Sequence, residues 1–132
     1  MAYPSVHKVA TVHITGHMPD CSSATASNSV IGVRVPFRAR LDLVSVTQQA
    51  QITSANAVFT IKKNSTTING TGSDATTANV LTLLTATAAN SATTYTPSSP
   101  TYVVGGDVIL FSSDHGSSTA CPCVCEIVLT PA

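Results

Sequence analysis

Cysteine carries the most reactive side chain in this sequence, and three of the four cysteines lie close together near the C-terminus. They are Cys121, Cys123 and Cys125 in a C-x-C-x-C pattern, with Cys21 far upstream and His115 nearby. Alternate residues of a strand lie about 6.6–6.8 Å apart. That spacing is too long for a disulfide between neighbours, and it suits a tetrahedral zinc ion only if the chain bends at Pro122. We expect free, buried thiols and no cofactor or metal. The alternatives are a disulfide that includes Cys21 and a metal site.

Histidine is the second candidate for metal chemistry. His7, His13 and His17 recur near the N-terminus, and His7 and His13 share the same parity along an expected early strand at Lys8–Thr15. Three ligands on one strand face would be unusual, and no carboxylate follows them until Asp20. We expect a surface or interface role for these histidines. The alternative is a metal held by one histidine from each chain of a trimer.

Nucleophilic catalysis would need a base within reach of an activated serine or cysteine. The only adjacent acid–base pair is Asp114-His115, and Gly116 follows it in a segment with the composition of a turn. No G-x-S-x-G elbow occurs. Gly105-Gly106 lacks the spacing of a phosphate-binding loop. We therefore expect a protein that binds and does not catalyse.

Alternation with period two is the pattern that recurs along the chain, and it predicts strands. In Ile31–Leu43 every odd residue is apolar, while the even positions include Arg34, Arg38 and Arg40. After Leu43 the apolar parity moves to Val44 and Val46, which indicates a bulge or corner. Pro36 cannot donate to a strand ladder and marks an edge, a bulge or a break.

Further segments extend this pattern. Ala57–Lys63, the Asn64-Ser65 turn and Thr66–Ile68 predict a hairpin, and Val80–Thr87 is a strand or a short helix, with its threonines favouring a strand. Thr101–Val104 and Asp107–Ser113 predict a strand pair or one bent strand, and Cys123–Leu129 predicts the last strand. Seven or eight short strands without a convincing helix predict an all-β, jelly-roll-like antiparallel sandwich or a barrel. We expect one domain over residues 9–132, preceded by an arm at residues 1–8.

Composition limits the classes of partner. The chain has 132 residues, only 9% of them charged, and its six basic residues balance six acidic ones. Phosphate binding normally needs a basic excess, so nucleic acid is not expected. No segment is long and apolar enough to span a bilayer. A weakly charged surface has little electrostatic protection against association, which favours a surface covered by protein partners.

The three arginines are the most suggestive surface feature. In one continuous strand, Arg34, Arg38 and Arg40 would share a face, with only Asp42 to offset their charge. The functional interpretation is contact with an acidic protein surface, because guanidinium groups suit carboxylates. The alternative is a solvated face paired with acids on neighbouring strands.

Three segments together carry a resemblance. They are Val33-Arg-Val-Pro-Phe-Arg-Ala-Arg-Leu, Ala57-Val-Phe-Thr-Ile-Lys-Lys-Asn-Ser-Thr and Val103-Val-Gly-Gly-Asp-Val-Ile-Leu-Phe. Their order resembles that of small jelly-roll cement or decoration proteins of tailed-bacteriophage capsids, over most of residues 30–130. The clustered cysteines depart from that group.

The resemblance implies a structural virion protein at the capsid surface, assembled in the host cytoplasm. It implies self-association as a trimer or dimer, and docking on the major capsid protein so that the mature shell is stabilised. The arm that contains Tyr3 and Pro4 would lie along a neighbour. Another structural subunit of a virus head or tail is one alternative. A carbohydrate-binding β-sandwich is another, although the chain has no tryptophan.

Overall fold

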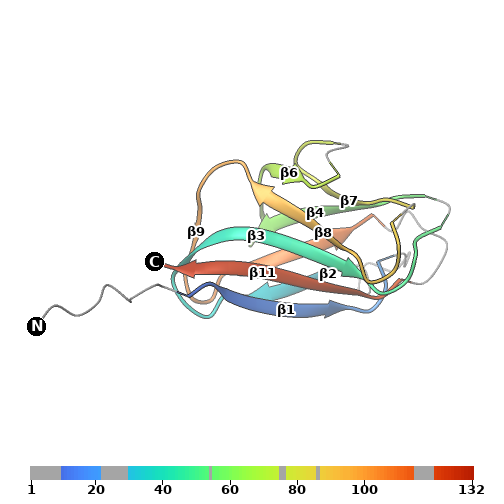
Figure 1. The fold of residues 1–132 in the computed structure, drawn as a ribbon. Coiled ribbons are helices and arrows are strands. Elements are labelled where there is room, and N and C mark those ends of the chain that lie inside the picture. Colours follow the sequence, from blue (N-terminus) through green and yellow to red (C-terminus); the bar gives the residue numbers. More distant parts are fainter. Residues whose placement is uncertain (1–9, 22–29, 54, 75–76, 86, 115–120) are drawn as a thin grey trace, which may run out of the picture.

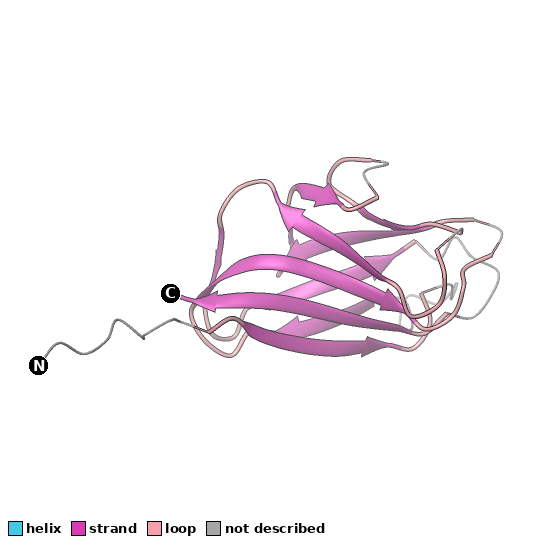
Figure 2. Ribbon diagram, in the orientation of Figure 1, coloured by secondary structure: helices cyan, strands magenta, loops and turns pink. Residues whose placement is uncertain are grey.

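The computed structural model describes residues 10–21, 30–53, 55–74, 77–85, 87–114 and 121–132. The described residues form strands, turns and loops without a helix (Figure 2), so none of them belongs to a helix that could cross a membrane. The strands are β1 (Val12–Met18), β2 (Val30–Arg34), β3 (Ala39–Gln48), β4 (Ala57–Lys63), β5 (Thr66–Thr67), β6 (Gly70–Gly72), β7 (Leu81–Leu83), β8 (Ala92–Pro97), β9 (Thr101–Val103), β10 (Val108–Ser113) and β11 (Cys123–Pro131).

The strands form two antiparallel sheets packed face to face (Figure 1). One sheet has the order β1-β11-β3-β8-β6, with β9 paired to the other end of β3. The second sheet has the order β2-β10-β4-β5, with β7 also paired to β4. Each sheet therefore mixes strands from both halves of the chain.

The pairing of eight of the strands follows a single rule. β1 pairs with β11, β2 with β10, β3 with β8 and β4 with β7, so the first half of the chain folds back on the second as a double ribbon. Wrapping that ribbon gives the sheets β1-β11-β3-β8 and β2-β10-β4-β7, which is the arrangement of a jelly roll. The predicted jelly-roll-like sandwich is confirmed. The short strands β5, β6 and β9 are additional to it.

The core lies between the two sheets and consists of the alternate residues that the pattern assigns to one face. Phe59, Phe111 and Tyr95 are the largest of the fully buried side chains. The Tyr95 hydroxyl donates a 2.6 Å hydrogen bond to the Ile68 carbonyl, so this buried polar atom is satisfied. The predicted inward residues of β4 and β11 are all buried: Ala57, Phe59, Ile61, Cys125, Ile127 and Leu129.

The alternating pattern at residues 31–43 suggested one continuous strand, but the structure has two strands there, β2 and β3. The segment divides at residues 35–38, so Pro36 marks a break, which is one of its three predicted roles. β2 therefore belongs to one sheet and β3 to the other. The parity change near Leu43 is a bulge, as predicted. Leu41 faces Leu129 and Leu43 faces Val128, so Asp42 is the extra residue.

The late strands β9 and β10 also lie in different sheets. β9 pairs with β3, whereas β10 pairs with β2 and β4, so these two strands are neither a hairpin nor one bent strand. Gly106 forms the corner with a φ of 97°, which an L-residue adopts only with strain. By contrast, the predicted hairpin at Asn64 is present, with Asn64 at a φ of 56°, and the Leu-rich segment contains strand β7.

Candidate interaction surface and thiol cluster

Five of the six basic residues lie within the described residues, and all five are at one end of the sandwich. Arg34 ends β2, Arg38 and Arg40 flank the start of β3, and Lys62 and Lys63 end β4. The register brings these strand ends together, since Arg34 lies opposite Val108 and Lys63 lies opposite Ile109 at the start of β10. We call this group of five residues the basic end.

The expectation that the three arginines share one face of a continuous strand is wrong. Arg34 and Arg40 lie in different sheets, so the three arginines do not form a stripe on one strand face. They meet because the chain crosses from one sheet to the other between them. Arg34 and Arg38 are exposed, and within the described part of the chain neither makes an ion pair.

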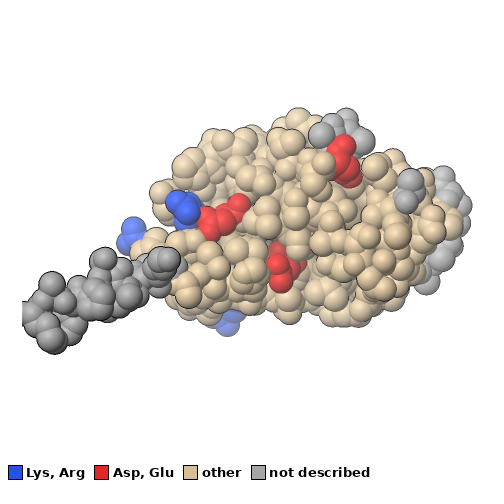
Figure 3. All heavy atoms as spheres, in the orientation of Figure 1, with Lys and Arg blue, Asp and Glu red and all other residues tan. Residues whose placement is uncertain are grey.

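The carboxylates are not gathered at the end where the cations lie, so positive and negative charge are separated along the molecule although the net charge is zero. All six acidic residues are described, and only Asp42 and Asp107 lie at the basic end, against five cations. Asp20 and Asp114 follow the far ends of β1 and β10. On the face drawn in Figure 3, the blue atoms gather toward one end, and red atoms continue across the middle and toward the other end. The basic end therefore carries a local positive excess.

Arg40 is the member of the basic end that forms an ion pair among the described residues. Its Nε donates to Asp42 Oδ1 at 2.6 Å, and the Thr130 hydroxyl donates to the other carboxylate oxygen. Partial burial would raise the pKa of Asp42, but the hydrogen bonds from Thr130 and Arg40 and the Arg40 charge outweigh it, so this pKa is lowered from 3.8. The bulge at Asp42 is thus held by a charged pair.

We expect the Asp42→Asn variant to lose stability at neutral pH, by about 1 kcal/mol, because a charge-assisted hydrogen bond is weakened. A carboxyl whose pKa is lowered in the folded state contributes stability above its unfolded pKa, and this contribution disappears as the pH falls through the folded pKa. The stability difference between wild type and variant should therefore shrink below about pH 4. Urea unfolding at several pH values measures it, with Glu126→Gln as the matched carboxylate-to-amide control. A difference independent of pH would contradict the assignment.

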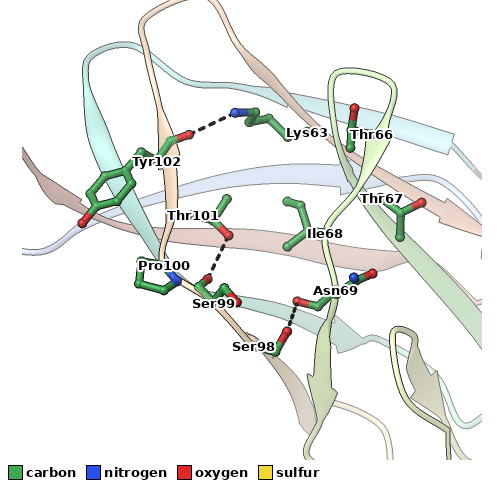
Figure 4. Close-up of a pocket in the computed structure, with 10 residues that line it drawn as sticks. All are labelled: Lys63, Thr66, Thr67, Ile68, Asn69, Ser98, Ser99, Pro100, Thr101 and Tyr102. Carbon is green, nitrogen blue, oxygen red and sulfur yellow. Dashed lines mark hydrogen bonds between the residues drawn. The ribbon is translucent and has the colours of Figure 1, made fainter.

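A groove of about 330 Å³ adjoins the basic end, between the β4–β5 hairpin and the loop that joins β8 to β9 (Figure 4). Lys63 Nζ donates to the Tyr102 carbonyl at 3.2 Å across one end of the groove, and Ser98 donates to the Asn69 carbonyl across the other. The groove is lined by Lys63, Thr66, Thr67, Ile68, Asn69, Ser98, Ser99, Pro100, Thr101 and Tyr102.

Two further hollows open on this end of the molecule, one beside Arg40 and Asp42 and one beside Arg34 and the Gly105-Gly106 turn. Tyr102 and Val104 are the most exposed large apolar residues described, at 58% and 54%. The period-two pattern of β9 already predicts that Tyr102 points away from the core. Its proximity to the arginines follows only from the pairing of Arg40 with Tyr102 across β3 and β9.

The chemistry of this surface suits a protein partner. Arg34 and Arg38, which have no ion pair within the described ranges, lie near an exposed tyrosine and shallow hollows. This combination suits an acidic surface with apolar spots, because interfaces are enriched in tyrosine and arginine. A carbohydrate site would combine aromatic rings with acids, but no carboxylate lines the groove and Tyr102 is its one aromatic residue.

All four cysteines lie within the described residues, and all four are buried and form no disulfide. They lie toward the opposite end of the sandwich from the basic end. The sulfur atoms of Cys21, Cys121 and Cys123 all lie within 4.8 Å of one another, and we call these three residues the thiol cluster. The sequence pattern grouped Cys121 and Cys123 with Cys125, but Cys125 is not part of the cluster. Cys121 lies two residues before β11, which begins at Cys123.

Hydrogen bonds hold Cys21 against the C-terminal strand. The Cys21 amide donates to the Cys121 carbonyl at 2.9 Å, the Cys121 amide donates to Asp20 Oδ1 at 2.9 Å, and the Ser113 hydroxyl donates to the Cys21 carbonyl at 2.7 Å. A hydrogen bond from the Cys123 thiol is the main cause that lowers the pKa of Cys21. Burial raises the pKa of Cys121 to about 11 and that of Cys125 to about 12.

The other candidate residues are not brought together. His13 and His17 are exposed on β1, where His13 lies 3.2 Å from Glu126 and His17 lies 3.3 Å from Gln49. Asp114 accepts the Val58 amide at 2.9 Å, which is a structural role at the end of β10. The remaining predicted residues, Tyr3, Pro4, His7 and His115, lie outside the described residues.

Comparison with known proteins gives a fold and no family. No protein-family model and no curated protein matches this chain. Among solved structures, it is similar to a chain of the "Acidic stable capsid structure of Helicobacter pylori bacteriophage KHP30", at 16% sequence identity and a TM-score of 0.52. The match covers 96% of this chain and 92% of that chain. The similarity establishes a shared fold over almost the whole of both chains.

Proposed function

We propose that this chain is a structural virion protein that binds the outer surface of a phage capsid and stabilises the mature shell, as cement or decoration proteins do. The observation that carries the proposal is the fold match to a chain of a phage capsid structure, which leaves little of either chain unmatched. The resemblance of residues 30–130 to phage cement proteins points the same way. The role requires binding and no catalysis.

The basic end is the proposed docking surface. Arg34 and Arg38 are exposed and have no ion pair among the described residues, so they are available to carboxylates of a major capsid protein. The exposed Tyr102 beside them supplies apolar contact. Docking through this end would leave the acidic residues of the opposite end, Asp20 and Asp114, away from an acidic shell.

Stabilisation follows from mass action. A ligand that binds only the mature lattice stabilises it by RT ln(1 + [L]/Kd), which is about 2.7 kcal/mol per site at roughly 100 times Kd. We further propose that the chain is a dimer or trimer. Closed oligomers engage several capsid subunits at once, so modest contacts per copy give strong attachment.

The test is co-sedimentation of the purified chain with mature and with unexpanded shells of its own virus. We expect binding to mature shells alone, and disruption of loaded shells at a higher temperature. Absence of binding, or absence of the chain from purified virions by mass spectrometry, would refute the proposal. Assembly into the shell lattice or the tail would support the alternative of another structural subunit.

A further inference from the structure

The thiol cluster is separate from the proposed docking surface and lies at the opposite end of the sandwich. Cys123 is the first residue of β11, Cys121 lies just before that strand, and Cys21 comes from the segment that follows β1. All three side chains are 0% exposed. Three sulfur atoms within 4.8 Å of one another resemble a ligand set more closely than three scattered core thiols do.

We propose that Cys21, Cys121 and Cys123 bind one soft metal ion, of the class that prefers thiolate ligands. Bonds of about 2.3 Å from a tetrahedral zinc to sulfur place two sulfurs roughly 3.8 Å apart, so sulfurs that lie within 4.8 Å of one another need to approach by at most about 1 Å. On binding, each coordinating thiol forms a metal–sulfur bond and releases its proton to water. The metal keeps its oxidation state.

The surrounding contacts already position the ligands. Two hydrogen bonds join the Cys21 segment to the Cys121 segment: the Cys21 amide donates to the Cys121 carbonyl, and the Cys121 amide donates to Asp20. The Ser113 hydroxyl donates to the Cys21 carbonyl. The Cys121 thiol donates to the Ala50 carbonyl at 3.3 Å and the Cys123 thiol donates to the Cys121 carbonyl at 3.5 Å, and both bonds end when the thiols lose their protons on metal binding. The bonds of the Cys21 amide, the Cys121 amide and the Ser113 hydroxyl involve backbone atoms of the cysteines, so they can persist when a metal binds. Such supporting contacts are typical of sites whose ligands are held in place by their neighbours.

A second observation points to an occupant in the same region. Gln48 lies directly opposite Cys123 in the pairing of β3 with β11, and both side chains are 0% exposed. Gln48 Nε2 donates to the Thr87 carbonyl at 2.9 Å, but Gln48 Oε1 is buried without a hydrogen-bond partner in the described residues. Buried acceptors without partners are rare, and a bound ion is one of the features that explains them.

The three sulfur donors favour soft metal ions over hard ones. Thiolate ligands favour Cu⁺ and Zn²⁺ over Mg²⁺ or Ca²⁺. Three sulfurs complete the shell of a three-coordinate Cu⁺, whereas Zn²⁺ takes a fourth ligand to become tetrahedral. The proposal therefore covers one thiophilic ion per chain, and the experiment compares these two ions.

The test uses the full, reduced chain under anaerobic conditions, titrated separately with Cu⁺ and Zn²⁺, with the bound ions counted by native mass spectrometry. We expect one ion per chain with at least one of the two metals, removed by chelator. Cys21→Ser, Cys121→Ser and Cys123→Ser should each weaken binding by roughly 100-fold or more. Cys125→Ser is the matched control, because Cys125 is equally buried on β11 but outside the cluster, and it should bind like wild type.

X-ray absorption of the loaded wild type gives a readout that does not depend on the variants folding. We expect three sulfur ligands at about 2.3 Å. The proposal is overturned if the reduced chain binds neither ion stoichiometrically, if Cys125→Ser weakens binding as much as the cluster variants, or if absorption shows fewer than three sulfurs. A disulfide from Cys21 that persists in the protein isolated without oxidant would equally overturn it. None of these results depends on whether the chain binds capsids.

Discussion

Replacing Phe59 with alanine is expected to destabilise the fold by about 3–5 kcal/mol, because the change removes a ring from a close-packed core and leaves a cavity. Phe59 is fully buried on β4 and lies between Ser113 of β10 and Leu81 of β7 in the strand register. It therefore contacts the strands on both sides of β4 at the centre of one sheet. Domains of this size are stable by only about 5–15 kcal/mol, so the loss is a large fraction of the total.

The matched control is Val58→Ala, one residue earlier on the same strand. Val58 is only partly buried and points to the opposite face of the sheet. We expect this substitution to cost less than about 1 kcal/mol. Equilibrium unfolding in urea measures both variants. Equal losses for Phe59→Ala and Val58→Ala would show that the core is not the layer between the two sheets.

Replacing Arg34, Arg38 and Arg40 together with serine is expected to weaken shell binding by about 10- to 100-fold per copy and to reduce its dependence on salt. Exposed ion pairs contribute about 0.2–1 kcal/mol each, and three pairs in the upper half of that range account for a loss of that size. This prediction rests on the proposed docking surface. Co-sedimentation with mature shells over a range of salt concentrations measures both quantities.

The structure divides the effect among the three arginines. Arg40 is already paired with Asp42, whereas Arg34 and Arg38 have no ion pair in the described residues. The double replacement of Arg34 and Arg38 should therefore produce most of the loss. The corresponding lysine variants keep the charge and should restore the salt dependence, while the missing guanidinium fork limits the recovered affinity. Docking unchanged in the triple serine variant would assign these residues to a solvated face.

The charge separation bears on how such a chain would approach a shell. Five cations against two carboxylates at one end, with the other four carboxylates elsewhere, give an overall neutral molecule a preferred orientation in the field of an acidic surface. Orientation of this kind raises association rates more than it raises affinity. This surface would be overlooked from the composition alone, because the total charge is zero.

The sequence by itself determined where most strands lie and which face of each is buried. Ala57–Lys63 and Cys123–Leu129 are strands with the predicted residues inward, and the parity change near Leu43 is a bulge. These features follow from alternation among near neighbours, which the pleat of one strand imposes locally. The all-β class follows from the same patterns.

Only the tertiary structure decided which strands share a sheet and which side chains meet. The alternating segment at residues 31–43 has one apolar pattern, yet it contributes a strand to each sheet. The pattern does not change at the crossing, because the apolar side chains of both strands face the same core between the sheets. Likewise the grouping of strand ends at the basic end depends on pairing between distant segments. The same is true of the approach of Cys21 to Cys121, which lie 100 positions apart in the sequence. The packing of the whole jelly roll around one core determines which distant strands pair, so these pairs cannot be predicted from a local pattern of residues.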